Sequence, residues 1–164
     1  MSASSVLSSS GVERVRRALA EAGLRAAIVE LPGAARTARA AADFLGCDVA
    51  QIANSLVFRL EASGAPLLVM SSGARRVDVA RLATLAGEPV GKADAAFVRE
   101  QTGFAIGGVP PVGHVRPPRT FVEESLAAHG EIWAAAGHPH TVFRLTYADL
   151  LRITGGTPVS AAVT

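Results

Sequence analysis

The sequence of 164 residues contains little cysteine and few aromatic residues. The lone Cys47 excludes an internal disulfide and cannot build a cysteine-rich zinc site, and a small buried apolar role suits it better than that of a nucleophile. Aromatic residues make up 5% of the chain, which argues against a platform for stacked nucleobases. The longest apolar run, residues 65–70, is far shorter than the roughly 20 residues of a membrane helix. We therefore expect no membrane association.

The common catalytic motifs are also missing. The chain has no G-x-S-x-G nucleophile elbow, no P-loop and no H-E-x-x-H zinc motif. Residues 103–108 fit a dinucleotide fingerprint poorly, because they precede a proline-rich stretch instead of opening a helix. His138 and His140 lie two residues apart without a carboxylate beside them, which is weak evidence for a metal site. We expect neither a metal nor a cofactor.

Charge is nearly balanced, with 16 Lys and Arg against 14 Asp and Glu. The arginines are scattered, so they favour weak, salt-sensitive contact with phosphates and argue against DNA duplex binding. Residues 1–10 are rich in serine and lack Lys and Arg, which predicts a frayed N-terminus and not a secretory signal. The default expectation is a cytoplasmic protein.

The pattern of elements predicts one α+β domain with a mixed, curved sheet. Ser10-x-x-Glu13 has the form of a capping box and opens a helix that ends at Gly23. Further helices are predicted after Thr37, in 77–86, after Asp94 and after Thr146. Strands are predicted at 26–31, 54–60, 66–70, around Val90, and at 112–115, 120–123, 132–135 and 141–145.

The most unusual segment is residues 102–114, which holds four glycines, two adjacent prolines and a histidine. Glycine allows backbone conformations closed to other residues, and proline fixes its own φ. Such a segment is a bent backbone of fixed shape, and a ligand there would be held largely by main-chain N–H and C=O groups. The alternative is a structural turn between two strands.

This segment resembles the glycine–proline loop of the YbaK/EbsC family of aminoacyl-tRNA deacylases, which includes the editing domain inserted in bacterial prolyl-tRNA synthetases. The resemblance runs from about Val12 to Val159, and it predicts an editing domain over residues 11–160. It implies a partly closed sheet with helices around it and a pocket lined by the glycine-rich loop. The other matching segments are Leu31-Pro32 with Thr37-Ala38, residues 52–58, residues 71–73 with Asp78, residues 135–137 and residues 149–155.

The resemblance also implies a site. The amides of Gly107 and Gly108 would stabilise the oxyanion that develops during ester hydrolysis. Asn54 stands where most characterised relatives carry a lysine that engages the substrate, and its alternative is a strand-start residue with no site role. The other expected substrate-binding residues are Ser55, Ser71, Ser72, Val109, Pro110, Gly113, His114, Gly137 and His138.

Three of these residues have competing interpretations. His114 follows the loop directly, so a hydrogen bond that stabilises the loop competes with a role in the reaction. His138 adjoins a proline in a turn, where it can equally be exposed to solvent. Ser72 can serve as a helix cap, its hydroxyl accepting from an otherwise unpaired backbone N–H.

The function expected from the resemblance is a trans-editing hydrolase. Its substrate would be mischarged aminoacyl-tRNA, in particular tRNA-Pro carrying alanine, cysteine or serine. Its partner would be the acceptor end of the tRNA, with a prolyl-tRNA synthetase as a further candidate. The alternatives are a binding module for aminoacyl-tRNA or a small ligand that has lost the family lysine, and a purely structural or interaction domain.

Overall fold

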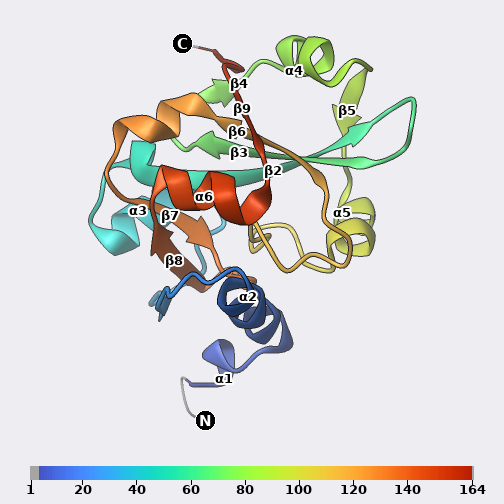
Figure 1. The fold of residues 1–164 in the computed structure, drawn as a ribbon. Coiled ribbons are helices and arrows are strands. Elements are labelled where there is room, and N and C mark those ends of the chain that lie inside the picture. Colours follow the sequence, from blue (N-terminus) through green and yellow to red (C-terminus); the bar gives the residue numbers. More distant parts are fainter. Residues whose placement is uncertain (1–3, 164) are drawn as a thin grey trace.

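The computed structural model describes residues 4–163, and its helices surround a central sheet (Figure 1). The helices are α1 (Ser4–Leu7), α2 (Ser10–Glu21), α3 (Ala38–Leu45), α4 (Val79–Ala86), α5 (Ala95–Thr102) and α6 (Tyr147–Thr154), with 3-10 turns η1 (Val49–Gln51) and η2 (Glu124–Ala128). The strands are β1 (Ile28–Glu30), β2 (Ile52–Leu60), β3 (Pro66–Ser72), β4 (Arg76–Val77), β5 (Val90–Lys92), β6 (Arg119–Glu123), β7 (Ile132–Ala135), β8 (Thr141–Leu145), β9 (Thr157–Val159) and β10 (Ala162–Val163).

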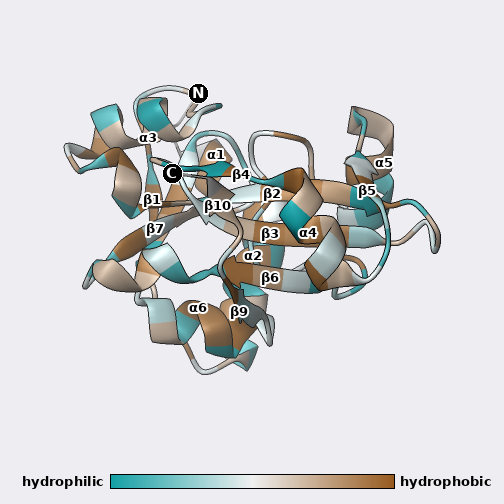
Figure 2. Cartoon of the chain, turned by 90° about the horizontal axis from the view of Figure 1, so that it is seen from above, coloured by the Kyte–Doolittle hydropathy of each residue, from teal (hydrophilic) through white to brown (hydrophobic). Residues whose placement is uncertain are grey.

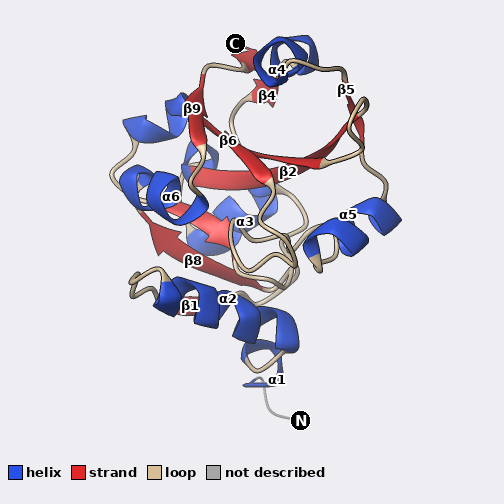
Figure 3. Cartoon of the chain, turned by 45° about the vertical axis from the view of Figure 1, so that its right-hand side comes forward, coloured by secondary structure: helices blue, strands red, loops and turns tan. Residues whose placement is uncertain are grey.

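The main sheet is mixed and open, with strand order β1-β8-β7-β2-β3-β6-β9 and β5 paired to the far end of β2. The β2–β3 and β7–β8 pairs are antiparallel hairpins, whereas β2–β7, β3–β6 and β6–β9 are parallel. The strands cross the middle of the molecule, and the helices lie around them (Figure 3). The expected α+β class with a mixed sheet in one domain is confirmed.

The core is formed where the sheet meets its covering helices. Apolar colour is concentrated on β2, β3 and β6 in Figure 2. The helix α2 packs through Val12, Val15 and Leu19, all at most 2% exposed, as their i, i+3/i+4 spacing predicts. No helix in residues 4–163 is long and apolar enough to cross a membrane.

Local capping signals fix most helix ends where the sequence places them. Thr37 accepts a hydrogen bond from the Ala40 N–H, and Gly46 closes the same helix at φ 67°, a left-handed value that glycine adopts without strain. Capping boxes form at η1, between Asp48 and Gln51, and at α6, where Thr146 is the cap. These ends hold the two segments that lead into β2 and out of β8.

Some boundaries differ from the predictions. The cap of α2 is Ser9, whose hydroxyl accepts from the Val12 N–H, so the capping box expected at Ser10 is wrong. Of the segment predicted to be frayed, residues 1–3 lie outside the described residues, whereas Ser4–Leu7 form α1. The predicted strand at 112–115 is a loop, and β4, β9 and β10 were not anticipated because they are held by distant pairing partners.

Candidate functional site

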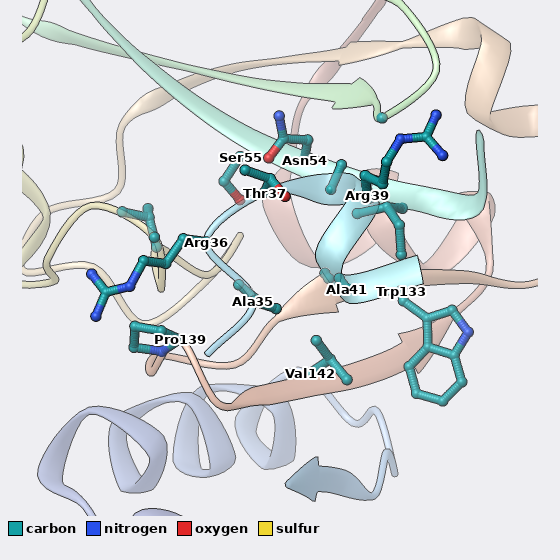
Figure 4. Close-up of a pocket in the computed structure, with 18 of the residues that line it drawn as sticks. Ala35, Arg36, Thr37, Arg39, Ala41, Asn54, Ser55, Trp133, Pro139 and Val142 are labelled. Atoms are coloured by element: carbon teal, nitrogen blue, oxygen red, sulfur yellow. The ribbon is translucent and has the colours of Figure 1, made fainter. Parts of the chain in front are cut away.

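A cavity of about 500 Å³ opens between α3, the start of β2, the β7–β8 hairpin and the glycine–proline loop. This volume is within the usual range of small-molecule sites, about 300–1,000 Å³. Figure 4 shows its polar side chains on one side and the apolar Ala41 and Val142 below them. The residues that line it are Ala35, Arg36, Thr37, Ala38, Arg39, Ala41, Val49, Ile52, Ala53, Asn54, Ser55, Leu56, Gly73, Ile106, Gly107, Val109, Trp133, Ala134, Ala135, Pro139, Thr141 and Val142.

The polar wall comes from two elements that meet at the cavity. Asn54 and Ser55 lie on β2, and Thr37 at the N-cap of α3 lies beside them (Figure 4). The Ser55 hydroxyl is 3.4 Å from the sulfur of Met70, a weak acceptor. Within the described part of the chain the Asn54 amide makes no hydrogen bond to protein. It is therefore free to offer both a donor and an acceptor to a ligand.

Every formal charge on the cavity lining is positive. Among its lining residues, all in the described chain, there is no Asp, Glu, His or Cys, whereas Arg36 and Arg39 both contribute. A serine nucleophile at Ser55 would therefore have no general base beside it. The arrangement favours a mechanism that positions a water molecule and stabilises negative charge, without an activated side-chain nucleophile.

The glycine–proline loop reaches the cavity through Ile106, Gly107 and Val109. Gly107 adopts φ 97°, and its N–H has no hydrogen-bond partner among residues 4–163. The Gly108 N–H donates instead to the Ala105 carbonyl at 3.2 Å, and Gly108 does not line the cavity. In this structure the Gly108 N–H is thus engaged in a turn hydrogen bond, and its expected role toward a ligand stays a prediction.

Gly108 has a packing role. A Cβ built on it would lie 2.9 Å from the His138 carbonyl carbon, closer than real Cβ atoms approach backbone. Only glycine lets the loop lie directly on the β7–β8 turn. The two glycines thus have different roles. Gly108 lets the loop pack on the β7–β8 turn, and Gly107 lines the cavity.

Arg14 and His114 hold the loop from behind. The Arg14 guanidinium, 4.7 Å from the Phe104 ring centroid, donates to the Gly113 carbonyl at 2.7 Å and reaches the Gly103 carbonyl at 3.5 Å. The His114 Nε2 donates to the Pro110 carbonyl at 2.6 Å. The loop is rigid because these two side chains tie its backbone at both ends.

Burial lowers the pKa of His114, and the nearby Arg14 charge acts in the same direction, although the bond to Pro110 opposes them. Its Nδ1 is buried without a partner, so protonation there would leave a charge unpaired.

The free energy of unfolding is expected to fall as the pH drops below about 6.5, because the unfolded chain then binds the proton more readily than the folded protein. His114→Gln should reduce the fall in melting temperature between about pH 7.5 and about pH 5, while His129→Gln, the matched control, should leave it unchanged. The fall is reduced and not abolished, because the pKa of His138 is also lowered, by burial and by His140. An unaltered pH dependence in His114→Gln would contradict this account.

Gly137 and His138 lie next to the cavity but do not line it. A Cβ on Gly137, at φ 100°, would be 2.7 Å from the Gly11 carbonyl oxygen, so this glycine permits the first turn of α2 to pack on the β7–β8 turn. The His138 Nδ1 accepts from the His140 N–H at 3.0 Å. The structure thus places both residues beside the cavity and not in its lining, and their expected contact with an amino acid stays a prediction.

The remaining expected residues support the site from outside it. Ser71 is buried and pairs with Asn54 across the β2–β3 hairpin. Ser72 lies in β3, donates to the Ala50 carbonyl and accepts from the Ala74 N–H, so it is not a helix cap; Asp78 caps α4. Pro110 and Gly113 contribute carbonyls to the bonds that hold the loop.

Sequence reasoning missed several lining residues. Thr37 was assigned only a capping role, and Trp133 and Thr141 were assigned only to strands. The arginines at 36 and 39 were counted as scattered charge. One signal was available, because residues 35–39 span the predicted start of a helix. In the structure this start lies beside the glycine–proline loop, but the contact joins segments about 70 residues apart and leaves no local pattern.

Together, these features define a small α+β domain with an open mixed sheet and a cavity beside the glycine–proline loop, lined by main-chain groups, neutral polar side chains and two arginines. The family model for the aminoacyl-tRNA editing domain matches residues 33–153. The chain belongs to this family, as the resemblance to YbaK-like proteins implied.

Solved structures of similar sequence extend over nearly the whole chain. A protein proposed to be a trans-editing enzyme for prolyl tRNA synthetase is 41% identical, with a TM-score of 0.89 over 95% of this chain and 99% of that one. The hypothetical protein APE2540 is 25% identical, with a TM-score of 0.85 over 92% of this chain and 99% of that one.

A relative is also found by sequence alone. The uncharacterized protein YwhH of Bacillus subtilis (strain 168) is 28% identical over 123 residues, which is 75% of this chain and 78% of that protein.

Proposed function

We propose that this protein is a trans-editing hydrolase that deacylates mischarged aminoacyl-tRNA. The observation that carries the proposal is a cavity lined by Gly107, whose N–H has no hydrogen-bond partner in residues 4–163, and by Asn54, whose amide is unpaired in the same residues. Membership of the editing-domain family supports the reaction class. The likeness to a protein proposed to edit for prolyl tRNA synthetase supports tRNA-Pro as the substrate and that synthetase as a partner.

The proposed hydrolysis does not require a catalytic side-chain nucleophile. The amino acid is joined to the ribose by an ester, which is already activated toward water. Hydrolysis then needs a positioned water molecule and a donor for the oxygen that becomes negative, and the Gly107 N–H is such a donor. In this proposal the hydroxyls of Thr37 and Ser55 and the Asn54 amide, which all belong to lining residues, orient the water and the substrate.

Much of the cavity lining is apolar. It includes several alanines from three different elements. An apolar pocket separates substrates that differ by one methylene by only about 1–3 kcal/mol. The active site of a synthetase faces the same limit, so mischarged tRNA requires a separate editing site. The proposed substrates of this site are alanine, cysteine and serine attached to tRNA-Pro.

The test is the loss of ester from tRNA-Pro charged with alanine, cysteine, serine or proline. We expect the full-length protein to release at least one of the three small non-cognate amino acids faster than proline and faster than spontaneous hydrolysis. The control Gly108→Val should abolish the acceleration, because the added side chain cannot fit against the His138 backbone.

The neutral Asn54 and the lack of a base favour one competing candidate, a binding module without turnover. Binding of charged tRNA-Pro with no acceleration for any of the three esters would support that candidate and reject the hydrolase. Neither binding nor turnover would reject both.

A further inference from the structure

The two arginines of the cavity lie on either side of Thr37 and point to opposite sides of its mouth (Figure 4). Both are exposed, and within residues 4–163 neither guanidinium has an ion pair or a hydrogen bond. Elsewhere on the chain, Arg14, Arg144 and Arg152 are occupied by carbonyls or carboxylates. The cavity mouth therefore carries two available positive charges.

Arg36 lies directly beside the loop. Its Cγ and the Cγ of Pro139 would each be 3.9 Å from a Cβ built on Gly107. The stem of Arg36 thus crosses between the glycine–proline loop and the β7–β8 turn, with its guanidinium beyond the cavity wall (Figure 4). A chain leaving the cavity at this point would meet the guanidinium next.

These positions fit one kind of anion. In an aminoacyl ester the carboxylate of the amino acid is consumed by the bond to ribose, so the anions that remain in the substrate are backbone phosphates. Arginine matches phosphate with two parallel N–H donors. The same charges disfavour an ammonium group nearby, so they also turn the amino group of the ester away from the mouth.

We infer that Arg36 and Arg39 hold backbone phosphates of a single-stranded RNA end, one on each side of the cavity mouth, with Arg36 nearer the reacting ester. This inference rests on the proposed function for the identity of the RNA. It adds that the phosphates are bound by one arginine just before α3 and one in its first turn, while Asn54 inside the cavity stays neutral. A single strand is specified because the scattered positive charge elsewhere does not form a duplex-binding face.

The first test is binding, which needs no turnover. The probe is a 5′-fluorescein RNA hairpin with a single-stranded CCA end, titrated by fluorescence anisotropy at several salt concentrations. Arg36→Gln and Arg39→Gln should each weaken binding about three- to fivefold at low salt. Each should also flatten the slope of log K against log salt by about 0.7, the value for one phosphate on a single strand. Arg36→Lys should keep the slope.

The control is Arg17→Gln, which removes the same charge from an exposed arginine of α2 that does not line the cavity. Binding by this variant should match the wild type. Equal slopes for Arg36→Gln and the wild type, or an equal loss in Arg17→Gln, would overturn the inference. Melting by circular dichroism confirms that each variant is folded.

The second test uses two esters of the same amino acid, one on tRNA-Pro and one on adenosine, which has no phosphate. Arg36→Gln should raise KM for the tRNA ester by a larger factor than KM for the adenosine ester. An equal loss on both esters would instead place Arg36 at the reacting group and reject a phosphate contact. Arg36-dependent binding of the hairpin by a wild-type protein that hydrolyses neither ester would reject the proposed function and keep this inference.

Discussion

Replacing Gly107 by alanine is expected to lower kcat for the proposed deacylation about 10²–10³-fold, with little change in KM. The residue adopts φ 97°, where a side chain costs about 1–2 kcal/mol of strain, so the backbone will rotate to relieve it. Rotation turns the N–H away from the ester oxygen. Because that donor acts mainly as negative charge develops, its loss appears in kcat more than in substrate binding.

The fold should survive this change. The nearest atoms to a Cβ on Gly107 are 3.9 Å away, which is ordinary contact distance. Gly108→Ala is the matched comparison, because its Cβ would collide with the His138 backbone. We expect Gly107→Ala to lose activity with nearly unchanged melting temperature and Gly108→Ala to lose both. Full activity in Gly107→Ala would mean that the oxyanion is stabilised elsewhere.

The sequence predicted the elements whose ends are set by neighbours in the chain. Thr37 and Gly46 bound α3 because a cap hydroxyl and a left-handed glycine act within one turn. The β2–β3 hairpin follows from two apolar runs joined by a four-residue turn, and each strand extends two residues further than predicted toward the cavity. Of those extra residues, Ile52 and Ala53 line the cavity, whereas Ser71 and Ser72 lie outside it.

The composition of the loop predicted a bent backbone, but it did not predict which glycine lines the cavity and which packs on the β7–β8 turn. The two glycines differ because the Gly108 N–H donates a hydrogen bond to the Ala105 carbonyl and Gly108 packs against His138, 30 residues further along the chain. Arg14 ties a loop about 90–100 residues away, and no periodic pattern distinguishes it from Arg17 on the same helix. Such contacts are decided by tertiary packing, so a single sequence carries no local sign of them.

Asn54→Lys is expected to raise kcat/KM for the proposed substrate about tenfold. The residue lines the cavity from β2 and its amide is not committed to another group in the described chain. An ammonium there would make charge-assisted hydrogen bonds, which are roughly twice as strong as neutral ones, to the developing oxyanion or to the terminal nucleotide. Asn54 is half-buried at the cavity wall, so the new charge keeps part of its hydration before substrate binds, which limits the cost of burying it.

The measurement is kcat/KM on tRNA-Pro charged with alanine, cysteine or serine, and the controls are Asn54→Gln and Asn54→Met. Glutamine lengthens the side chain without charge, and methionine adds bulk without a donor, so neither should reproduce the gain. An increase shared by all three variants would indicate a change of cavity shape. A loss in Asn54→Lys alone would indicate that Arg36 and Arg39 already supply the positive charge that this cavity tolerates, and that the neutral amide is what the reaction requires.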